Sequence, residues 1–347
     1  QNSEKNQLFH PEVFVSYKKI KKNIISAGID YRYMQFTRTA VAEYNQFAWG
    51  AFLQNETDLD QITIYSAVRL DNTENNEPVL SPKLTILYSP FSKIRIRAGV
   101  SRGYHAPTIQ ELYEEGYGHS GRAYRFGNPD LEAEYSFNSN LSIEYVPTSN
   151  LQVFAYAYKS NITNMITPVY SGIWAENPDT STVIDKWVRT NVHKAEIWGM
   201  ELAVRYKPLE KLKIEIGYNY SDNQNSSTGT PLPYYPGQSL FAKVNYGIKI
   251  SNKISATSFV SLRSVKDRAA WNWKPASGES FDNSNGLITE LADYQMLNAG
   301  IKVVINSKTE FYLKASNLLS QNIEKLDDAL MVIVGEPVYS YGLILNF

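Results

Sequence analysis

The stretch KLKIEIGYNY, residues 211–220, alternates between two kinds of side chain. Every second residue from Leu212 to Tyr220 is apolar or aromatic, and the residues between them are charged or small and polar. A period of two is typical of a β-strand whose faces meet different surroundings. About ten residues is also the length that a tilted strand needs to cross a bilayer. The stretch therefore favours a membrane-spanning strand.

The same alternation recurs along the chain, for example at 93–101 and 198–206. It predicts an all-β protein with about fifteen antiparallel strands. Their expected ranges are 11–22, 23–38, 45–58, 61–71, 80–90, 93–103, 135–147, 151–166, 187–206, 211–222, 236–249, 252–265, 293–305, 309–318 and 337–347.

The connections between these strands are of two kinds. Segments 88–94, 145–151 and 206–212 share the pattern Tyr-x-Pro-x-x-(Lys/Asn)-(Ile/Leu), which predicts short turns after an aromatic strand end. The other connections are long and polar, and they are expected at 107–134, 171–187, 221–237, 265–291 and 320–336. Short turns on one rim and long loops on the other are typical of outer-membrane barrels, whereas a water-soluble sandwich or propeller is the alternative. We expect a single transmembrane antiparallel β-barrel domain over 1–347.

Composition narrows the classes of function. The 347 residues carry a net charge of −1 without a basic tract, which argues against a nucleic-acid partner. Cysteine is absent, which excludes thiol catalysis and Cys-ligated metals. The four His show no zinc-site spacing and no Gly-x-Ser-x-Gly occurs, so we expect neither a preformed metal site nor an enzyme.

The last predicted strand ends on alternating aromatic and apolar residues. This pattern resembles the C-terminal signal of bacterial outer-membrane proteins that the barrel assembly machinery recognises. The residues that carry it are Tyr339, Tyr341, Leu343, Leu345 and Phe347. The resemblance makes the assembly machinery an expected partner, and an ordinary final strand is the alternative.

The insert at 101–136 resembles a known family. Its segments 103–107 (GYHAP) and 127–134 (GNPDLEAE) are similar to the paired boxes of TonB-dependent outer-membrane receptors. The first box departs from the usual Gly-Phe-Arg-Ala-Pro, with Tyr104 and His105 in place of Phe and Arg. Segments 191–202 and 315–323 resemble further motifs of these receptors, so the resemblance runs from about residue 80 to the end.

This resemblance implies a bacterial outer-membrane protein. Such receptors have 22 strands around an N-terminal plug, so we expect this chain to be the C-terminal part of a barrel whose plug is absent from it. The implied function is energised uptake of haem or a ferric siderophore, bound as cargo without a covalent cofactor. Implied partners are outer-membrane lipid, TonB through the plug, and a surface lipoprotein. A passive porin of 14–16 strands and a receptor for cobalamin or oligosaccharide are the alternatives.

The expected ligand site lies in the long extracellular loop 104–134. Haem-receptor branches of the family carry a functional His between the two boxes, where this sequence has His119. A neutral imidazole or a Tyr can ligate ferric iron, and Arg can pair with carboxylates. The candidate ligand residues are His119, Tyr117, Tyr113, Tyr124, Arg122 and Arg125. A solvated loop histidine is the alternative for His119.

The box residues are expected to anchor the ends of this loop. They are Tyr104, His105, Ala106, Pro107, Asn128, Pro129, Asp130 and Leu131. His105 stands at the corner between strand and loop, where we expect it to form hydrogen bonds rather than to ligate a metal.

Overall fold

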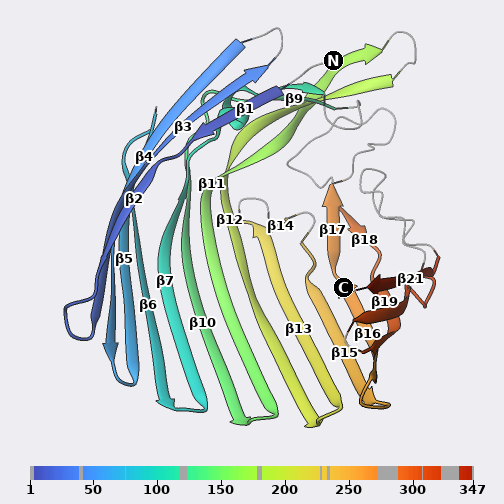
Figure 1. Ribbon diagram of the computed structural model, residues 1–347. Helices are drawn as coiled ribbons and strands as arrows, with labels where there is room; N and C mark the ends of the chain where they lie inside the picture. The colour runs from blue at the N-terminus through green and yellow to red at the C-terminus, as the bar shows by residue number, and fades with distance from the viewer. Residues whose placement is uncertain are drawn as a thin grey trace.

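The computed structural model describes residues 4–38, 42–74, 76–117, 123–177, 182–226, 229–232, 235–271, 288–306, 308–321 and 336–345. These residues form a 19-stranded sheet and a separate pair of strands, β17 and β18 (Figure 1). Consecutive long strands pair antiparallel throughout, which confirms the all-β expectation. Each predicted strand range overlaps a strand of the structure.

The elements are bounded as follows. The strands are β1 (Glu4–Phe9), β2 (Glu12–Tyr17), β3 (Asn23–Arg38), β4 (Ala42–Leu59), β5 (Ile62–Thr73), β6 (Val79–Phe91), β7 (Ile94–His105), β8 (Glu115–Tyr117), β9 (Ala123–Phe126), β10 (Glu134–Thr148), β11 (Leu151–Asn177), β12 (Thr182–Leu209), β13 (Leu212–Asn225), β14 (Thr230–Pro231), β15 (Gln238–Lys249), β16 (Ile254–Lys266), β17 (Arg268–Trp271), β18 (Ile288–Leu291), β19 (Tyr294–Ile305), β20 (Thr309–Ser316) and β21 (Val338–Leu345). The helix α1 spans Ile109–Tyr113.

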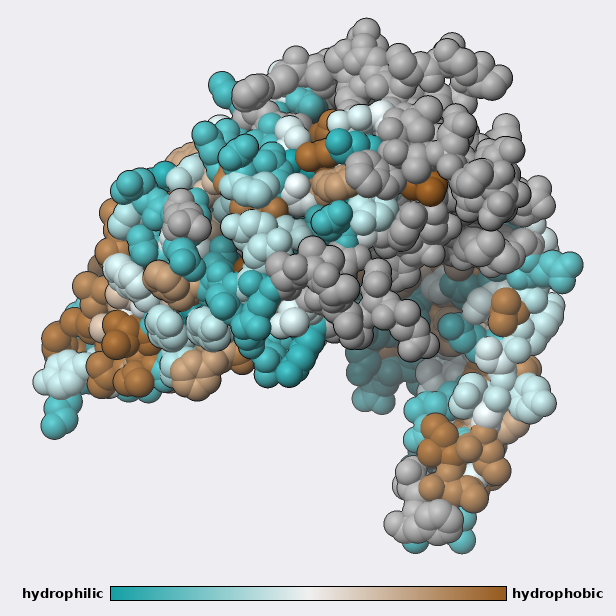
Figure 2. Space-filling view, turned by 90° about the horizontal axis from the view of Figure 1, so that it is seen from above, coloured by the Kyte–Doolittle hydropathy of each residue, from teal (hydrophilic) through white to brown (hydrophobic). Residues whose placement is uncertain are grey.

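The sheet curves into an open arch rather than a closed barrel. Within the described residues, β1 and β2 pair only with β3, and β21 pairs only with β20. Seen from above, the two arms of the arch stand apart around a hollow (Figure 2). No helix among the described residues is long and apolar enough to cross a membrane.

The two faces of the sheet differ as the opening stretch predicts. Ile216 of β13 lies beside Val204 of β12, and Leu202 lies beside Tyr218, on the same outer face. Leu202 is 47% and Ile216 is 46% exposed, and they are two of many large apolar side chains exposed on the sheet. Exposing so many large apolar side chains to water would be unfavourable. Apolar residues gather on the outer flank of the left-hand arm in Figure 2. This arrangement suits a wall that faces lipid.

The three predicted Pro turns share one structural feature. The ladder shifts register between Tyr88 and Phe91, between Tyr145 and Thr148, and between Tyr206 and Leu209. Each shift spans a proline, which has no N–H to donate to the ladder. These turns lie together on the lower rim of Figure 1.

The opposite rim has more regular structure than expected, since β8, β9, β14, β17 and β18 all lie within the predicted loops. The sequence predicts a loop at 171–187, but β11 continues to Asn177 and β12 begins at Thr182. The prediction of a loop there is wrong because β11 and β12, with 27 and 28 residues, are much longer than the roughly ten residues that a strand needs to cross the membrane. Their pairing therefore continues above the membrane. Its backbone hydrogen bonds continue up to the pair Asn177 and Thr182.

The predicted assembly residues of β21 are exposed on one face. Tyr339, Tyr341, Leu343 and Leu345 are 66%, 79%, 60% and 52% exposed, whereas Phe347 lies outside the described residues. Their recognition by the assembly machinery stays a prediction.

Candidate functional site

The loop between β7 and β10 contains the short helix α1 and the strands β8 and β9. Thr108 caps the helix, because its hydroxyl accepts a hydrogen bond from the Glu111 amide at 3.2 Å. The Glu111 carboxylate accepts in return from the Thr108 amide at 2.9 Å, which completes a capping box. This local chemistry explains why a helix forms directly after Pro107.

Glu111 also binds the histidine of the first box. The Nε2 atom of His105 lies 3.3 Å from Oε2 of Glu111. Burial alone would raise the pKa of Glu111, but hydrogen bonds from His105 and from the amide and hydroxyl of Thr108 together outweigh it and lower the pKa to about 2. Glu111 is therefore a carboxylate that links the strand end to the helix.

The second box packs against the other side of α1. The Gly127 amide donates to the Glu114 carbonyl at 2.5 Å, and the Asn128 amide donates to the Glu111 carbonyl at 2.9 Å. A Cβ atom at Gly127 would lie only 2.5 Å from the backbone of Leu112, so this close approach requires glycine. Leu131 of the same box is buried.

Two wall strands hold the loop from below and from the side. Pro107 is fully buried, and its carbonyl accepts a hydrogen bond from Nε2 of Gln46 on β4 at 3.1 Å. On β12, Asn191 accepts from the Glu132 amide and donates to the Glu132 carbonyl, both at 2.9 Å. Its side chain also donates to the Asn164 carbonyl on β11 at 2.7 Å.

Further contacts tie this loop to the tall hairpin of β11 and β12. Arg189 of β12 lies 3.4 Å from the Glu114 carboxylate. Strand β9 pairs parallel to β12 over the four residues from Asp185 to Val188. The loop, β8, β9 and the upper hairpin thus form one structure, which we call the cap.

The candidate ligand residues occupy different places in the cap. The ring of Tyr113 stacks on Tyr44 of β4, with centroids 4.1 Å apart and planes at 4°. Tyr124 donates to Glu115 at 3.5 Å and lies beside Phe126, and Arg125 is exposed on β9. Tyr117 belongs to β8, where its backbone pairs with Tyr124.

The remaining candidates, His119 and Arg122, lie outside the described residues. The structure therefore brings Tyr113, Tyr124 and Arg125 into one cap without testing the predicted histidine. No group of three His, Cys, Asp or Glu that could hold a metal occurs among the residues described.

Below the cap, the inner wall carries a network of four charges. Arg69 of β5 reaches Asp30 of β3 at 2.6 Å and Asp71 at 2.9 Å. Arg32 lies 3.3 Å from each of the same two carboxylates. The two guanidinium groups and the two carboxylates carry equal and opposite charges, so they offset one another. Their mutual contacts link β3 to β5.

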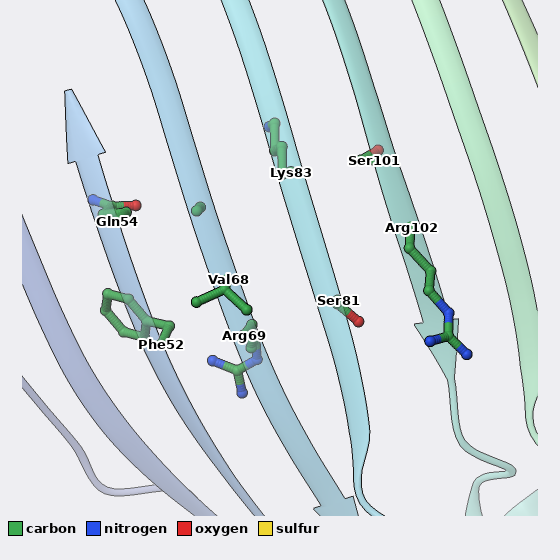
Figure 3. A pocket seen from close by; sticks show the side chains of 9 residues that line it. Phe52, Gln54, Val68, Arg69, Ser81, Lys83, Ser101 and Arg102 are labelled. Carbon is green, nitrogen blue, oxygen red and sulfur yellow. The ribbon is translucent and has the colours of Figure 1, made fainter. Parts of the chain in front are cut away.

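Two adjoining cavities flank this network. One has a volume of about 570 Å³ and lies under the first box, lined among others by Arg32, Gln46 and residues 103–108. The other has a volume of about 440 Å³ and is lined by side chains of β4 to β7 (Figure 3). Both include Arg69, Ser81 and Arg102, so they continue one another along the wall.

Sequence reasoning missed several residues that hold this site. Gln46, Tyr44 and Arg189 lie on wall strands, where their residue types carry no distinctive pattern. Asn191 opens segment 191–202, which resembles a family motif, and that resemblance is the signal that could have identified it.

The chain matches a known family over most of its length. Residues 10–318 match the family model described as TonB dependent receptor-like, beta-barrel. An iron-regulated outer membrane virulence protein of Vibrio cholerae serotype O1 is 23% identical over 281 residues, which are 79% of this chain and 41% of that protein. The ferric enterobactin receptor of Pseudomonas aeruginosa is 28% identical over 190 residues, which are 51% of this chain and 25% of that protein.

The names of other similar proteins mention different transported molecules. The vitamin B12 transporter BtuB of Photobacterium profundum is 26% identical over 187 residues, covering 54% of this chain and 28% of that protein. Among solved structures, the siderophore receptor PirA of Acinetobacter baumannii has a TM-score of 0.73 at 16% identity, covering 100% of this chain and 55% of that one. The copper transporter OprC has a TM-score of 0.71 at 16% identity, covering 100% of this chain and 57% of that one. These structures show the fold, and the chain spans about half or less of each protein it matches.

Proposed function

The chain belongs to the TonB-dependent receptor β-barrel family, whose place is the bacterial outer membrane, and from this premise we propose that its cargo is a ferric siderophore. In this proposal the arch forms part of the barrel wall and the cap receives the cargo. Energy would come from TonB, which would act on a plug domain. The relatives are longer than the matched region, which covers 41% of the first of them, so the proposal places the plug outside this region. The protein would transport its cargo and would not act as an enzyme.

One observation carries the choice of cargo. Relatives matched by sequence include an iron-regulated protein and a ferric enterobactin receptor, and these names support the proposal of iron over vitamin B12 and copper as cargo. The chemistry of the cap provides separate support for a ferric siderophore as cargo. A ferric catecholate is anionic and aromatic, and both properties can be matched by the residue types found in the cap.

The cap supplies these groups on β9, which pairs with β12. Arg125 is an exposed cation on β9, and a guanidinium fork suits paired anionic oxygens. Tyr124 lies next to it in sequence, beside Phe126 at a centroid distance of 5.1 Å. Aromatic faces of this kind stack on flat ligand rings. We propose Arg125 and Tyr124 as contact residues, with the box residues holding the cap in place.

Haem uptake stays a prediction of the sequence. It depends on His119, together with Tyr117 and Arg122, and the names of the relatives given above do not mention haem. A shift of the haem absorption band on adding haemin, lost in His119→Ala, would favour haem over a siderophore. A surface lipoprotein that delivers the cargo remains an expectation of the same kind.

Binding by the full-length purified protein tests the proposal. Ferric enterobactin, haemin and cyanocobalamin are titrated separately, and quenching of tryptophan fluorescence is followed. We expect the tightest binding for the ferric siderophore, with a loss of about tenfold in Arg125→Ala. Arg95→Ala, on the wall strand β7, is the matched control and should bind as the unchanged protein does. Tighter binding of haemin or cobalamin would refute the proposed cargo.

A further inference from the structure

His105 stands where the wall meets the cap. It is the last of the 12 residues of β7, and a strand needs only about nine to eleven residues to cross a bilayer. The helix α1 begins soon afterwards, at Ile109. In the wall, His105 is paired with Glu134, the first residue of β10. The side chain of His105 is 45% exposed, so it exchanges protons with water.

The contact between His105 and Glu111 fixes which ring nitrogen carries a hydrogen. Oε2 of Glu111 accepts hydrogen bonds from the amide and the hydroxyl of Thr108, each at 2.9 Å. The same oxygen lies 3.3 Å from Nε2 of His105. An ionised carboxylate oxygen can only accept, so Nε2 of His105 is the donor. This hydrogen bond joins the end of β7 to the first turn of α1.

Two carboxylates dominate the charge around His105. The hydrogen bond to Glu111 raises the pKa of His105 from the ordinary value of 6.5, burial lowers it, and the negative charges of Glu111 and Glu134 raise it further. The Glu134 carboxylate is itself held by the Ile166 amide of β11. The other charged or titratable side chains that line a cavity with His105 lie on β3, β5 and β7, and they are Arg32, Arg69, Asp71, Arg102 and Tyr104.

The two charge states of His105 hold α1 with different strength. A protonated imidazole donates a charge-assisted hydrogen bond to the Glu111 carboxylate, whereas the neutral ring makes a weaker one through the same Nε2. Because the pKa of His105 is raised in the folded protein, the stabilisation is fully present below about pH 6.5 and is lost as the pH rises through the raised value. The pKa of Glu111 is about 2, so its carboxylate stays ionised throughout this window.

This contact lies at the edge of a cavity. The volume of about 570 Å³ is lined by His105 and Thr108 on the side of the cap and by Arg32 and Gln46 on the wall. Gln46 holds the Pro107 carbonyl independently of the charge on His105. A weaker bond to Glu111 therefore lets α1 move away from the end of β7 while the first box stays anchored.

We infer that His105 and Glu111 form a pH-dependent latch, which holds α1 against the end of β7 beside this cavity when His105 is protonated and loosens when it is neutral. The latch acts in addition to the contacts that β4 and β12 make with the loop. It concerns the movement of the cap, and it holds whichever cargo the cap receives.

Hydrogen exchange of the full-length protein tests the latch. The Leu112 amide donates within α1 at 3.0 Å, and the Asn128 amide donates to the Glu111 carbonyl at 2.9 Å, so both report opening of this segment. Their exchange is measured at about pH 5.5 and about pH 8.5, on either side of the histidine titration, and is corrected for intrinsic rates. We expect roughly threefold more opening at the higher pH, which is the scale of a half-exposed ion pair. The ladder between β7 and β10 is the internal reference.

Two variants of His105 separate its charge from its hydrogen bond. His105→Arg carries a permanent charge and should show the low opening at both pH values. His105→Gln is neutral and should show the high opening at both. His10→Gln is the matched control, because His10 also lies near a carboxylate, 3.6 Å from Asp30, and this variant should keep the pH step.

Two results would overturn the latch. The first is equal opening of the unchanged protein at both pH values. The second is a pH step that persists in either His105 variant, which would assign the titration to another group. Heat-dependent mobility on gels reports whether each variant has formed its barrel, and either His105 variant alone decides the test if the other does not assemble.

Discussion

Nη2 of Arg69 lies 2.6 Å from Oδ2 of Asp30, and the contact crosses strand β4 directly over Gly50. A Cβ atom at Gly50 would lie 2.0 Å from the same Arg69 nitrogen and 2.9 Å from the same Asp30 oxygen. The absent side chain is therefore what allows β5 to bind β3. Because Asp30 is 6% exposed at its side chain, losing Arg69 would leave this buried carboxylate with only its longer contacts to Arg32 and His10.

Replacing this glycine should break the network. We expect Gly50→Ala to displace Arg69 and to destabilise the wall by about 3 kcal/mol, as removing one partner of a buried ion pair does. The measurement is the urea concentration at which the folded barrel band is lost on gels. Gly217→Ala is the control, since a Cβ there meets its nearest atom at 3.9 Å. Equal loss in both variants would show that the network contributes nothing specific.

The cap should loosen when Asn191 is removed. Asn191→Ala deletes three hydrogen bonds to Glu132 and Asn164, at a local cost of about 1–3 kcal/mol. We expect faster hydrogen exchange of the Glu132 amide, while Asn161→Ala, an exposed residue of β11, leaves that amide protected. Unchanged protection in Asn191→Ala would show that other contacts hold this end of the loop.

Acid should weaken the capping box. The pKa of Glu111 is lowered to about 2 from an ordinary value of 4.5, so its contribution is fully present above about pH 4.5 and is lost as the pH falls toward 2. We expect exchange of the Thr108 amide, corrected for its intrinsic rate, to rise over this window. Glu111→Gln should show fast exchange already at neutral pH and little further change. A pH profile identical in both proteins would contradict this account.

The stack between Tyr44 and Tyr113 should be worth about 1 kcal/mol beyond the burial of either ring. A double-mutant cycle with Tyr44→Ala and Tyr113→Ala measures this coupling through protease cleavage of the loop. Tyr113→Phe keeps the ring and should leave the loop protected. If Tyr113→Phe is as sensitive as Tyr113→Ala, the hydroxyl rather than the stack holds the helix.

Strand positions and faces were predictable from the sequence, because a period of two is encoded within each strand. The alternation at 211–220 places Ile216 and Tyr218 on one face of the strand and Gly217 on the other, as the structure shows. Contacts between strands that are not neighbours were not predictable in this way. Arg69 meets Asp30 only because the registers of β3, β4 and β5 align them across Gly50.

The candidate site was predictable in place but not in detail. The two box resemblances located the loop between β7 and β10. They could not show that Tyr113 stacks on Tyr44, since that contact depends on how α1 sits against a distant strand. The extension of β11 to Asn177 was missed because Pro168 and Gly172 interrupt its alternation, and the ladder there shifts register between Tyr170 and Ile173.

Uptake of radioactive iron by iron-starved cells tests the proposed function most directly. Cells that express the full-length protein, and lack their own receptors, are supplied with iron as ferric enterobactin, with or without a functional TonB. The account predicts accumulation of iron inside the cells that requires both the protein and TonB. Accumulation that is independent of TonB, or absent while cobalamin or haem is taken up, would contradict it.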